Sequence, residues 1–95
     1  MRYLKLFENK ELMTPDGWEE IKEKGKTSLY KKFKFKDFSE AFRFISKVAN
    51  LAEKLNHHPM WCNVYNVVEI NLSTHDAGNK ITKKDIEMAI LINKF

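Results

Sequence analysis

The alternation of apolar and polar residues predicts a β-hairpin early in the chain. Over residues 27–36 the alternation has a period of two, which is typical of a strand with one buried face. The apolar face comprises Leu29, Phe33 and Phe35, and the polar face comprises Tyr30, Lys32 and Lys34. Residues 18–24 give a weaker strand signal, and Gly25 lies between the two segments. The turn residues of the Thr-Pro-Asp-Gly run at 14–17 precede the first strand.

A long amphipathic helix is predicted after the hairpin. Asp37 and Glu40 have capping-box spacing, and Pro59 requires the helix to end near Asn56. Apolar residues at intervals of three and four predict one wide core-facing stripe. This stripe comprises Phe38, Ala41, Phe42, Ile45, Val48, Ala49, Ala52 and Leu55.

Two further strands and a loop follow the helix. Residues 63–65 and 67–73 are rich in β-branched and aromatic side chains, which predicts two strands joined by a tight turn. Residues 76–81 should form a loop, in which Gly78 and Asn79 tolerate positive φ angles.

The last segment predicts a second helix and completes the fold class. Thr82 and Asp85 again have capping-box spacing, and the inward-facing residues should be Ile86, Ala89, Ile90 and Leu91. Residues 3–13 could be a short helix or coil. The order strand, strand, helix, strand, strand, helix predicts a two-layer α+β sandwich, with a four-stranded antiparallel sheet and helices on one face. A chain of 95 residues is expected to form a single domain, residues 1–95.

Composition places the chain among soluble globular proteins. Apolar residues make up 43% and charged residues 32%, with a net charge of +4. A small RNA-binding domain is one interpretation of the lysines, but dispersed lysines more simply keep a small protein soluble. Cys62 is the single cysteine, which excludes an internal disulfide, and no apolar run is long enough to span a bilayer. We therefore expect a cytoplasmic protein without membrane or direct nucleic-acid binding, and entry into the nucleus stays open.

All three histidines lie in the second half of the chain. His57 and His58 follow the long helix, and His75 follows the predicted fourth strand. If that strand lies beside the helix exit, the three rings converge on one pocket. Imidazole both gives and takes protons near neutral pH, so such a pocket would suit acid–base catalysis.

Other chemistry is less favoured by the sequence. Glu53 and His57 are four residues apart on a helix and could bind a metal together with His58 and His75, but no known metal motif is present. Cys62 lies in an apolar and aromatic segment, where a buried structural thiol is the usual outcome.

A combined motif in the second half resembles that of the pterin-4a-carbinolamine dehydratases. Its parts are Glu53, His57-His58-Pro59, Tyr65, Thr74-His75 and Asp85. Upstream, Gly17-Trp18 and the pattern of Phe33, Phe35, Asp37 and Phe38 are similar to the same family, so the resemblance covers about residues 14–95. The chain departs from the family pattern at Met60 and in the loop around Gly78 and Asn79.

The resemblance implies a dehydratase that acts on 4a-hydroxytetrahydrobiopterin and regenerates the cofactor of aromatic amino acid hydroxylases. It implies no metal and no organic cofactor, and a homo-oligomer, either a dimer or a tetramer. A hydroxylase or a transcription factor would be the protein partner, and a non-catalytic dimerisation module is the alternative function. Exposed apolar area on the helices and an edge at residues 29–35 should then be covered by other subunits.

The family's site positions fall on two segments of this chain. The substrate-binding positions are Asn56, His57 and His58 at the helix exit, and Ser73, Thr74, His75 and Asp76 at the strand end. Trp18, Glu53, Pro59 and Asp85 would support them. Among the three catalytic histidines, we assign proton transfer to His57 and His75 and substrate binding chiefly to His58.

Overall fold

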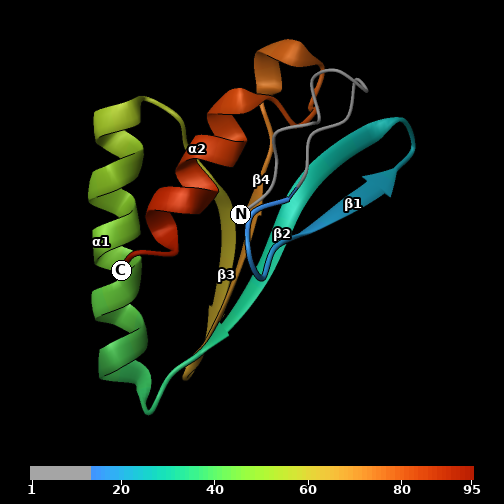
Figure 1. Cartoon of the computed structure of the whole chain (residues 1–95). Helices are drawn as coiled ribbons and strands as arrows, with labels where there is room; N and C mark the ends of the chain where they lie inside the picture. Colours follow the sequence, from blue (N-terminus) through green and yellow to red (C-terminus); the bar gives the residue numbers. More distant parts are fainter. Residues whose placement is uncertain (1–13) are drawn as a thin grey trace.

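The chain has a two-layer α+β architecture in the computed structural model, which describes residues 14–95 (Figure 1). Four antiparallel strands form one sheet in the order β1-β2-β4-β3, and both helices lie on one face of it. The elements are β1 (Glu19–Glu23), β2 (Lys26–Lys34), α1 (Phe38–Leu55), β3 (Met60–Val64), β4 (Val67–Leu72), the 3-10 helix η1 (His75–Ala77) and α2 (Lys83–Ile92). The predicted fold class is confirmed, whereas the segment 3–13 lies outside the described residues.

β1 and β2 form the predicted hairpin around a two-residue turn. Glu23 pairs with Lys26, and the turn residues Lys24 and Gly25 have φ angles of 49° and 78°. Positive φ at both positions matches the right-handed twist of the strands, which favours glycine in such turns. β2 pairs with β1 through residues 26–30 and with β4 through residues 29–34, so the expected edge at residues 29–35 lacks a neighbouring strand on one side only from Lys31 onward. β1 and β3 are the outer strands of the sheet.

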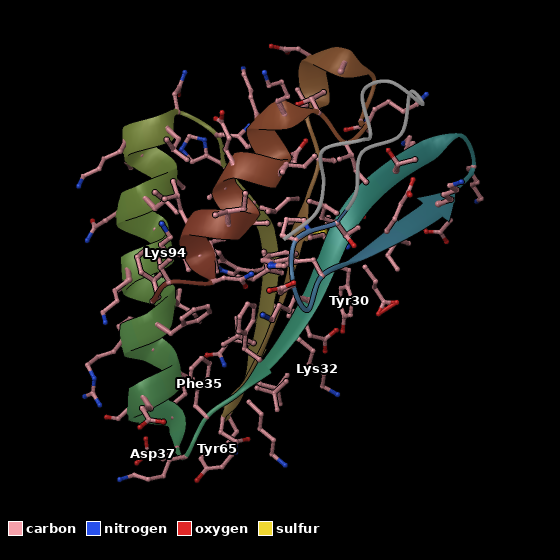
Figure 2. All side chains as sticks on the ribbon, viewed as in Figure 1. Tyr30, Lys32, Phe35, Asp37, Tyr65 and Lys94 are labelled. Atoms are coloured by element: carbon pink, nitrogen blue, oxygen red, sulfur yellow. The ribbon has the colours of Figure 1, made fainter. Side chains whose placement is uncertain are left out.

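The two faces of β2 differ as the alternation predicts. Leu29 is buried in the core, and Phe35 points toward α1 (Figure 2). Tyr30 and Lys32 project from the opposite face, which no helix covers (Figure 2). We call this second face the open face of the sheet.

α1 begins as predicted, and the predicted stripe is confirmed in part. The Asp37 side chain accepts a hydrogen bond from the Glu40 amide at 2.9 Å, which caps the helix. The buried residues are Ala41, Phe44, Ile45, Val48 and Ala52, while Phe38, Phe42 and Leu55 are exposed. The predicted stripe was too wide because Phe44, at the spacing of three from Ala41, packs its ring 4.6 Å from Phe33 and 4.9 Å from Phe35.

The second half differs from prediction mainly at one strand. β3 begins at Met60, three residues before the predicted start, because pairing with β4 extends to Met60 opposite Asn71. The predicted loop after β4 contains the short helix η1, and both Gly78 and Asn79 have positive φ as expected. The capping box of Thr82 and Asp85 is present at the start of α2. Among the described residues, no helix is long and apolar enough to cross a membrane.

Candidate active site

The end of α1 sends the two adjacent histidines in different directions. Asn56 adopts a left-handed conformation, with φ at 53°, and its N–H bonds the carbonyl oxygens of Ala52 and Glu53. The His57 amide also donates to the Ala52 carbonyl oxygen at 3.1 Å. Such a left-handed cap ends a helix sharply, and asparagine tolerates it better than most residues. His57 therefore turns inward and is buried, whereas His58 is exposed.

His57 is held by a buried carboxylate. Its Nε2 donates to Oδ1 of Asp85 at 2.6 Å, and Asp85 is fully buried. With Nε2 committed to the carboxylate as a donor, only Nδ1 of a neutral His57 can accept a proton. Asp85 thus sets the tautomer of His57 through one hydrogen bond.

The other oxygen of Asp85 joins two more elements. Oδ2 accepts hydrogen bonds from the Thr74 hydroxyl at 2.7 Å and from the Thr82 amide at 2.8 Å. The hydroxyls of Thr74 and Thr82 are also 2.6 Å apart. A buried carboxylate is tolerated when donors surround it in this way. Asp85 consequently ties together the exit of α1, the segment after β4 and the start of α2.

His58 forms a second, exposed pair. Its Nε2 donates to Oε2 of Glu53 at 2.7 Å, and the two side chains are 57% and 78% exposed. An exposed ion pair adds little stability, but this contact orients the ring and leaves Nδ1 as the acceptor of a neutral imidazole. The pairing also separates the metal ligands that the sequence suggested, since Glu53 contacts His58 and not His57. Among residues 14–95, no cluster of three or more His, Cys, Asp or Glu side chains is arranged to hold a metal.

His75 opens η1 at the other side of the site. Its side chain is exposed, and its carbonyl oxygen accepts from the Gly78 amide at 3.0 Å to close the short helix. The Thr74 amide bonds the Lys80 carbonyl oxygen at 2.9 Å, which closes the loop that follows. The backbone therefore positions His75 although its ring has no hydrogen-bond partner among the described residues.

An open cavity of about 740 Å³ lies between these segments on the open face of the sheet. Its volume falls within the range of small-molecule sites, which is roughly 300–1,000 Å³. The lining comprises Ile21, Glu23, Lys24, Lys26, Thr27, Ser28, His58, Pro59, Met60, Asn71, Ser73, His75 and Asn79. Asn71 lies opposite Tyr30 in the register, so it shares the open face with that residue.

The cavity contains only some of the residues that the sequence singled out. His58, Pro59, Ser73 and His75 line it. The remaining predicted residues are not in its lining: Trp18, Glu53, Asn56, His57, Thr74, Asp76 and Asp85. Of the three histidines, two thus meet at the cavity and the third lies buried beside Asp85.

Trp18 is a core residue and not part of the cavity. It is 4% exposed, and its Nε1 donates to Oδ1 of Asn93 at 3.0 Å. Lys31 donates to the same oxygen at 2.8 Å, and partial burial lowers the pKa of this lysine. These contacts join the end of α2 to Trp18 and to β2, away from the histidines.

Residues of the β1–β2 hairpin were missed by sequence reasoning. Six of them line the cavity, from Ile21 to Ser28. The alternation of β2 could have placed Ser28 on the open face, but its distance from the histidines in sequence hid the connection. On the same face, the hydrogen bond that Tyr30 donates to Glu69 at 2.8 Å raises the pKa of the tyrosine.

Nearly the whole chain matches the model of a known family. Residues 4–95 fit the sequence profile described as pterin 4 alpha carbinolamine dehydratase. The chain belongs to this family.

Relatives named provisionally as pterin-4-alpha-carbinolamine dehydratases agree with this assignment. The protein of Rhodopseudomonas palustris is 48% identical over 77 residues, which cover 81% of this chain and 73% of the relative. That of Prochlorococcus marinus is 57% identical over 67 residues, or 70% of each chain. That of Brucella ovis is 46% identical over 85 residues, or 90% of this chain and 84% of the relative.

Solved structures of pterin dehydratases and related proteins share the fold. A crystal structure of a transcriptional coactivator/pterin dehydratase from Brucella melitensis superposes with a TM-score of 0.75 and 47% identity, covering 83% of this chain and 81% of the other. A pterin dehydratase-like protein described as a RuBisCO assembly factor in the alpha-carboxysome gives a TM-score of 0.70 over 82% and 87% of the two chains. At 20% identity, the second likeness concerns the fold alone.

Proposed function

We propose that this chain dehydrates 4a-hydroxytetrahydropterins, with 4a-hydroxytetrahydrobiopterin as the expected substrate, to quinonoid dihydropterin and water. The observation that carries the proposal is the cavity lined by both His58 and His75, in a chain of the pterin carbinolamine dehydratase family. The reaction would restore the pterin cofactor of an aromatic amino acid hydroxylase.

The reaction needs one acid and one base, which act at the adjacent atoms C4a and N5 of the pterin. The bond between C4a and the hydroxyl oxygen breaks, and an acid protonates the departing hydroxyl to give water. A base takes the proton of N5, and the electron pair of that N–H bond forms the new double bond between N5 and C4a. The chain's own imidazoles can perform both transfers, so the step requires no oxidant, metal or cofactor.

The lining of the cavity favours His58 and His75 as this proton-transfer pair. The sequence assigned proton transfer to His57 and His75, but the ring of His57 is buried and donates its Nε2 proton to Asp85. His58 is exposed to the cavity, and Glu53 holds its Nε2 proton so that Nδ1 is the basic atom. We assign the role of His57 to positioning its neighbour, with Ser73 contributing polar groups for the flat pterin.

Residues beside the cavity keep supporting roles in the proposal. Asn56 and Pro59 set the direction in which His58 leaves α1. Thr74 and Asp76 flank His75 in sequence, and Thr74 connects it to Asp85. None of these contributions requires direct contact with the pterin.

A protein-binding role is the second candidate, since the Brucella melitensis structure carries the description transcriptional coactivator as well as pterin dehydratase. Phe38 and Phe42 on α1, with Trp61 on β3, are exposed apolar side chains that could be covered in a homo-oligomer or by a partner protein. Sedimentation should therefore show a dimer or tetramer, and a stable monomer at low micromolar concentration would contradict this assembly.

The test is turnover of the carbinolamine, generated by an aromatic amino acid hydroxylase and followed through the absorbance of quinonoid dihydropterin. His58→Ala and His75→Ala should each lose about 10²–10⁴-fold in rate and keep near-normal stability. His57→Ala should lose both activity and stability, because it leaves the Asp85 carboxylate buried without its partner.

Glu87→Gln is the control, since Glu87 is an exposed residue of α2 that does not line the cavity. Wild-type rates in the His58 and His75 variants would contradict the assignment of the site. No acceleration by the folded wild-type protein would contradict dehydratase activity and favour the protein-binding role.

A further inference from the structure

We propose that the β1–β2 hairpin is a binding subsite for an anionic side chain of the pterin, so that a pterin with a phosphorylated side chain binds more tightly than its unphosphorylated counterpart. This inference rests on the proposed function, because it assumes that the pterin ring lies between His58 and His75. The hairpin supplies six of the cavity-lining residues, and it lies on a segment distant in sequence from all three histidines.

The charge of the hairpin wall favours an anion. Lys24 and Lys26 both line the cavity, and Glu23 is the only carboxylate in the lining, which leaves one net positive charge before the histidines are counted. Glu23 faces Lys26 in the strand register, yet neither lysine lies within 4 Å of a carboxylate in the described part of the chain. Two ammonium groups beside a cavity with a single carboxylate in its described lining attract negative charge from a ligand.

The hairpin is connected directly to the loop that carries His75. The Thr27 amide donates to the Asn79 carbonyl oxygen at 3.0 Å, and the Ile81 amide donates to the Thr27 hydroxyl at 2.8 Å. Because η1 begins at His75 and leads directly into this loop, Thr27 fixes the backbone that carries the lysines relative to His75. A ligand that spans both regions would therefore meet a preorganised wall.

Polar groups between the two regions suit a hydroxylated side chain on the pterin. Asn71 donates to the Ser28 hydroxyl at 3.2 Å, and both residues line the cavity between β3 and the hairpin. The cavity of about 740 Å³ also has room for a side chain beside the bicyclic ring. A pterin with a phosphate at the end of a polyhydroxylated side chain matches the order of groups along the cavity: the histidines first, then the amide and hydroxyl groups, then the lysines.

Binding measurements with matched pterins test the subsite. The probes are 7,8-dihydroneopterin and its 3′-phosphate, and calorimetry gives the dissociation constant of each at low and high salt. We expect the phosphate ester to bind on the order of tenfold more tightly at low salt, as for two partly exposed ion pairs, and the advantage to shrink as salt increases. 7,8-Dihydrofolate, whose side chain carries carboxylates, is the third probe. Tighter binding of both dihydrofolate and the phosphate ester than of dihydroneopterin would show that the subsite prefers negative charge in general and not a phosphate ester alone.

The double variant K24Q/K26Q should lose the advantage of the phosphate ester and bind dihydroneopterin as the wild type does. K22Q is the matched control, because Lys22 lies in the same hairpin but does not line the cavity. Equal binding of the two neopterins by the wild type, or an advantage that K24Q/K26Q keeps, would overturn the subsite alone. Failure of both neopterins to bind would instead count against the proposed function.

Discussion

The substitution Asp85→Asn tests the buried network most directly, because it removes one charge and changes the shape of the side chain very little. Asp85 is fully buried and accepts hydrogen bonds from His57, Thr74 and Thr82 at 2.6, 2.7 and 2.8 Å. An asparagine oxygen can still accept from the two threonines. Its amide group, however, would point N–H donors at the donor nitrogen of His57, so the ring would have to change its tautomer.

The expected loss in the free energy of unfolding follows from the hydrogen bond between His57 and Asp85. A hydrogen bond to a charged group contributes about 1.5–3 kcal/mol, and the chain as a whole is expected to be stable by roughly 5–14 kcal/mol. A loss of about 2 kcal/mol should lower the Tm by about 8–16 °C. Asp85→Ala would leave several buried donors unpaired, and its loss of about 3–5 kcal/mol could unfold the chain, so the asparagine variant is the informative one.

Urea denaturation followed by tryptophan fluorescence measures the effect. Glu87→Gln on the same helix is the control and should change the free energy of unfolding by less than about 0.5 kcal/mol. If Asp85→Asn unfolds cooperatively within about 0.5 kcal/mol of the wild type, the carboxylate does not hold His57 as described, and the reasoning about its tautomer fails with it.

Three further predictions concern single residues. Thr27→Val removes the acceptor for the Ile81 amide and should lower kcat about tenfold with little change in KM, whereas Thr27→Ser should restore kcat; equal losses in both variants would contradict a positioning role. Asn56→Ala should cost about 1 kcal/mol in urea denaturation because φ is positive there, and Asn56→Gly should not; equal costs would contradict backbone strain as the cause. Because the hydrogen bond to Glu69 raises the pKa of Tyr30, the folded state holds that proton more tightly than the unfolded state. The resulting stability is present below about pH 10 and is lost as the pH rises through the raised pKa. As the pH rises above about 10, Tyr30→Phe should therefore lose less stability than the wild type does. An equal loss in the two proteins would refute the linkage.

The sequence predicted the elements whose signal is local. Alternation in residues 27–36 identified both faces of β2, and the capping spacing at Asp37 and Thr82 identified both helix starts. Prediction failed where the signal depends on neighbours. Whether Phe42 or Phe44 is buried depends on where Phe33 and Phe35 lie in the sheet, and the spacing along the helix does not contain that information.

The site shows the same division between local and distant information. The motif around His57, His58 and His75 is short enough to be recognised from sequence, and two of these three rings do meet at the cavity. The sequence could not show that His57 turns inward, because that depends on the left-handed cap at Asn56 and on a carboxylate 28 residues away. The hairpin wall was hidden for a similar reason, since β2 reaches the site only through its pairing with β4.

The contacts of Asp85 give a physical reason why a motif with two adjacent histidines also includes an aspartate 28 residues after the first of them. Two connections between the exit of α1 and the end of β4 determine the separation of His58 and His75, and the first is the strand pairing of Met60 with Asn71. The other connection is the chain of contacts from His57 through Asp85 to Thr74. In the sequence, His57 directly precedes His58, and Thr74 directly precedes His75. A buried carboxylate with three donors is stiff because any displacement leaves a charge unpaired at low dielectric. The same residue that stabilises the fold therefore helps to set the distance between the proposed acid and base, and its partners His57 and Thr74 lie beside His58 and His75 in sequence and not in the cavity lining.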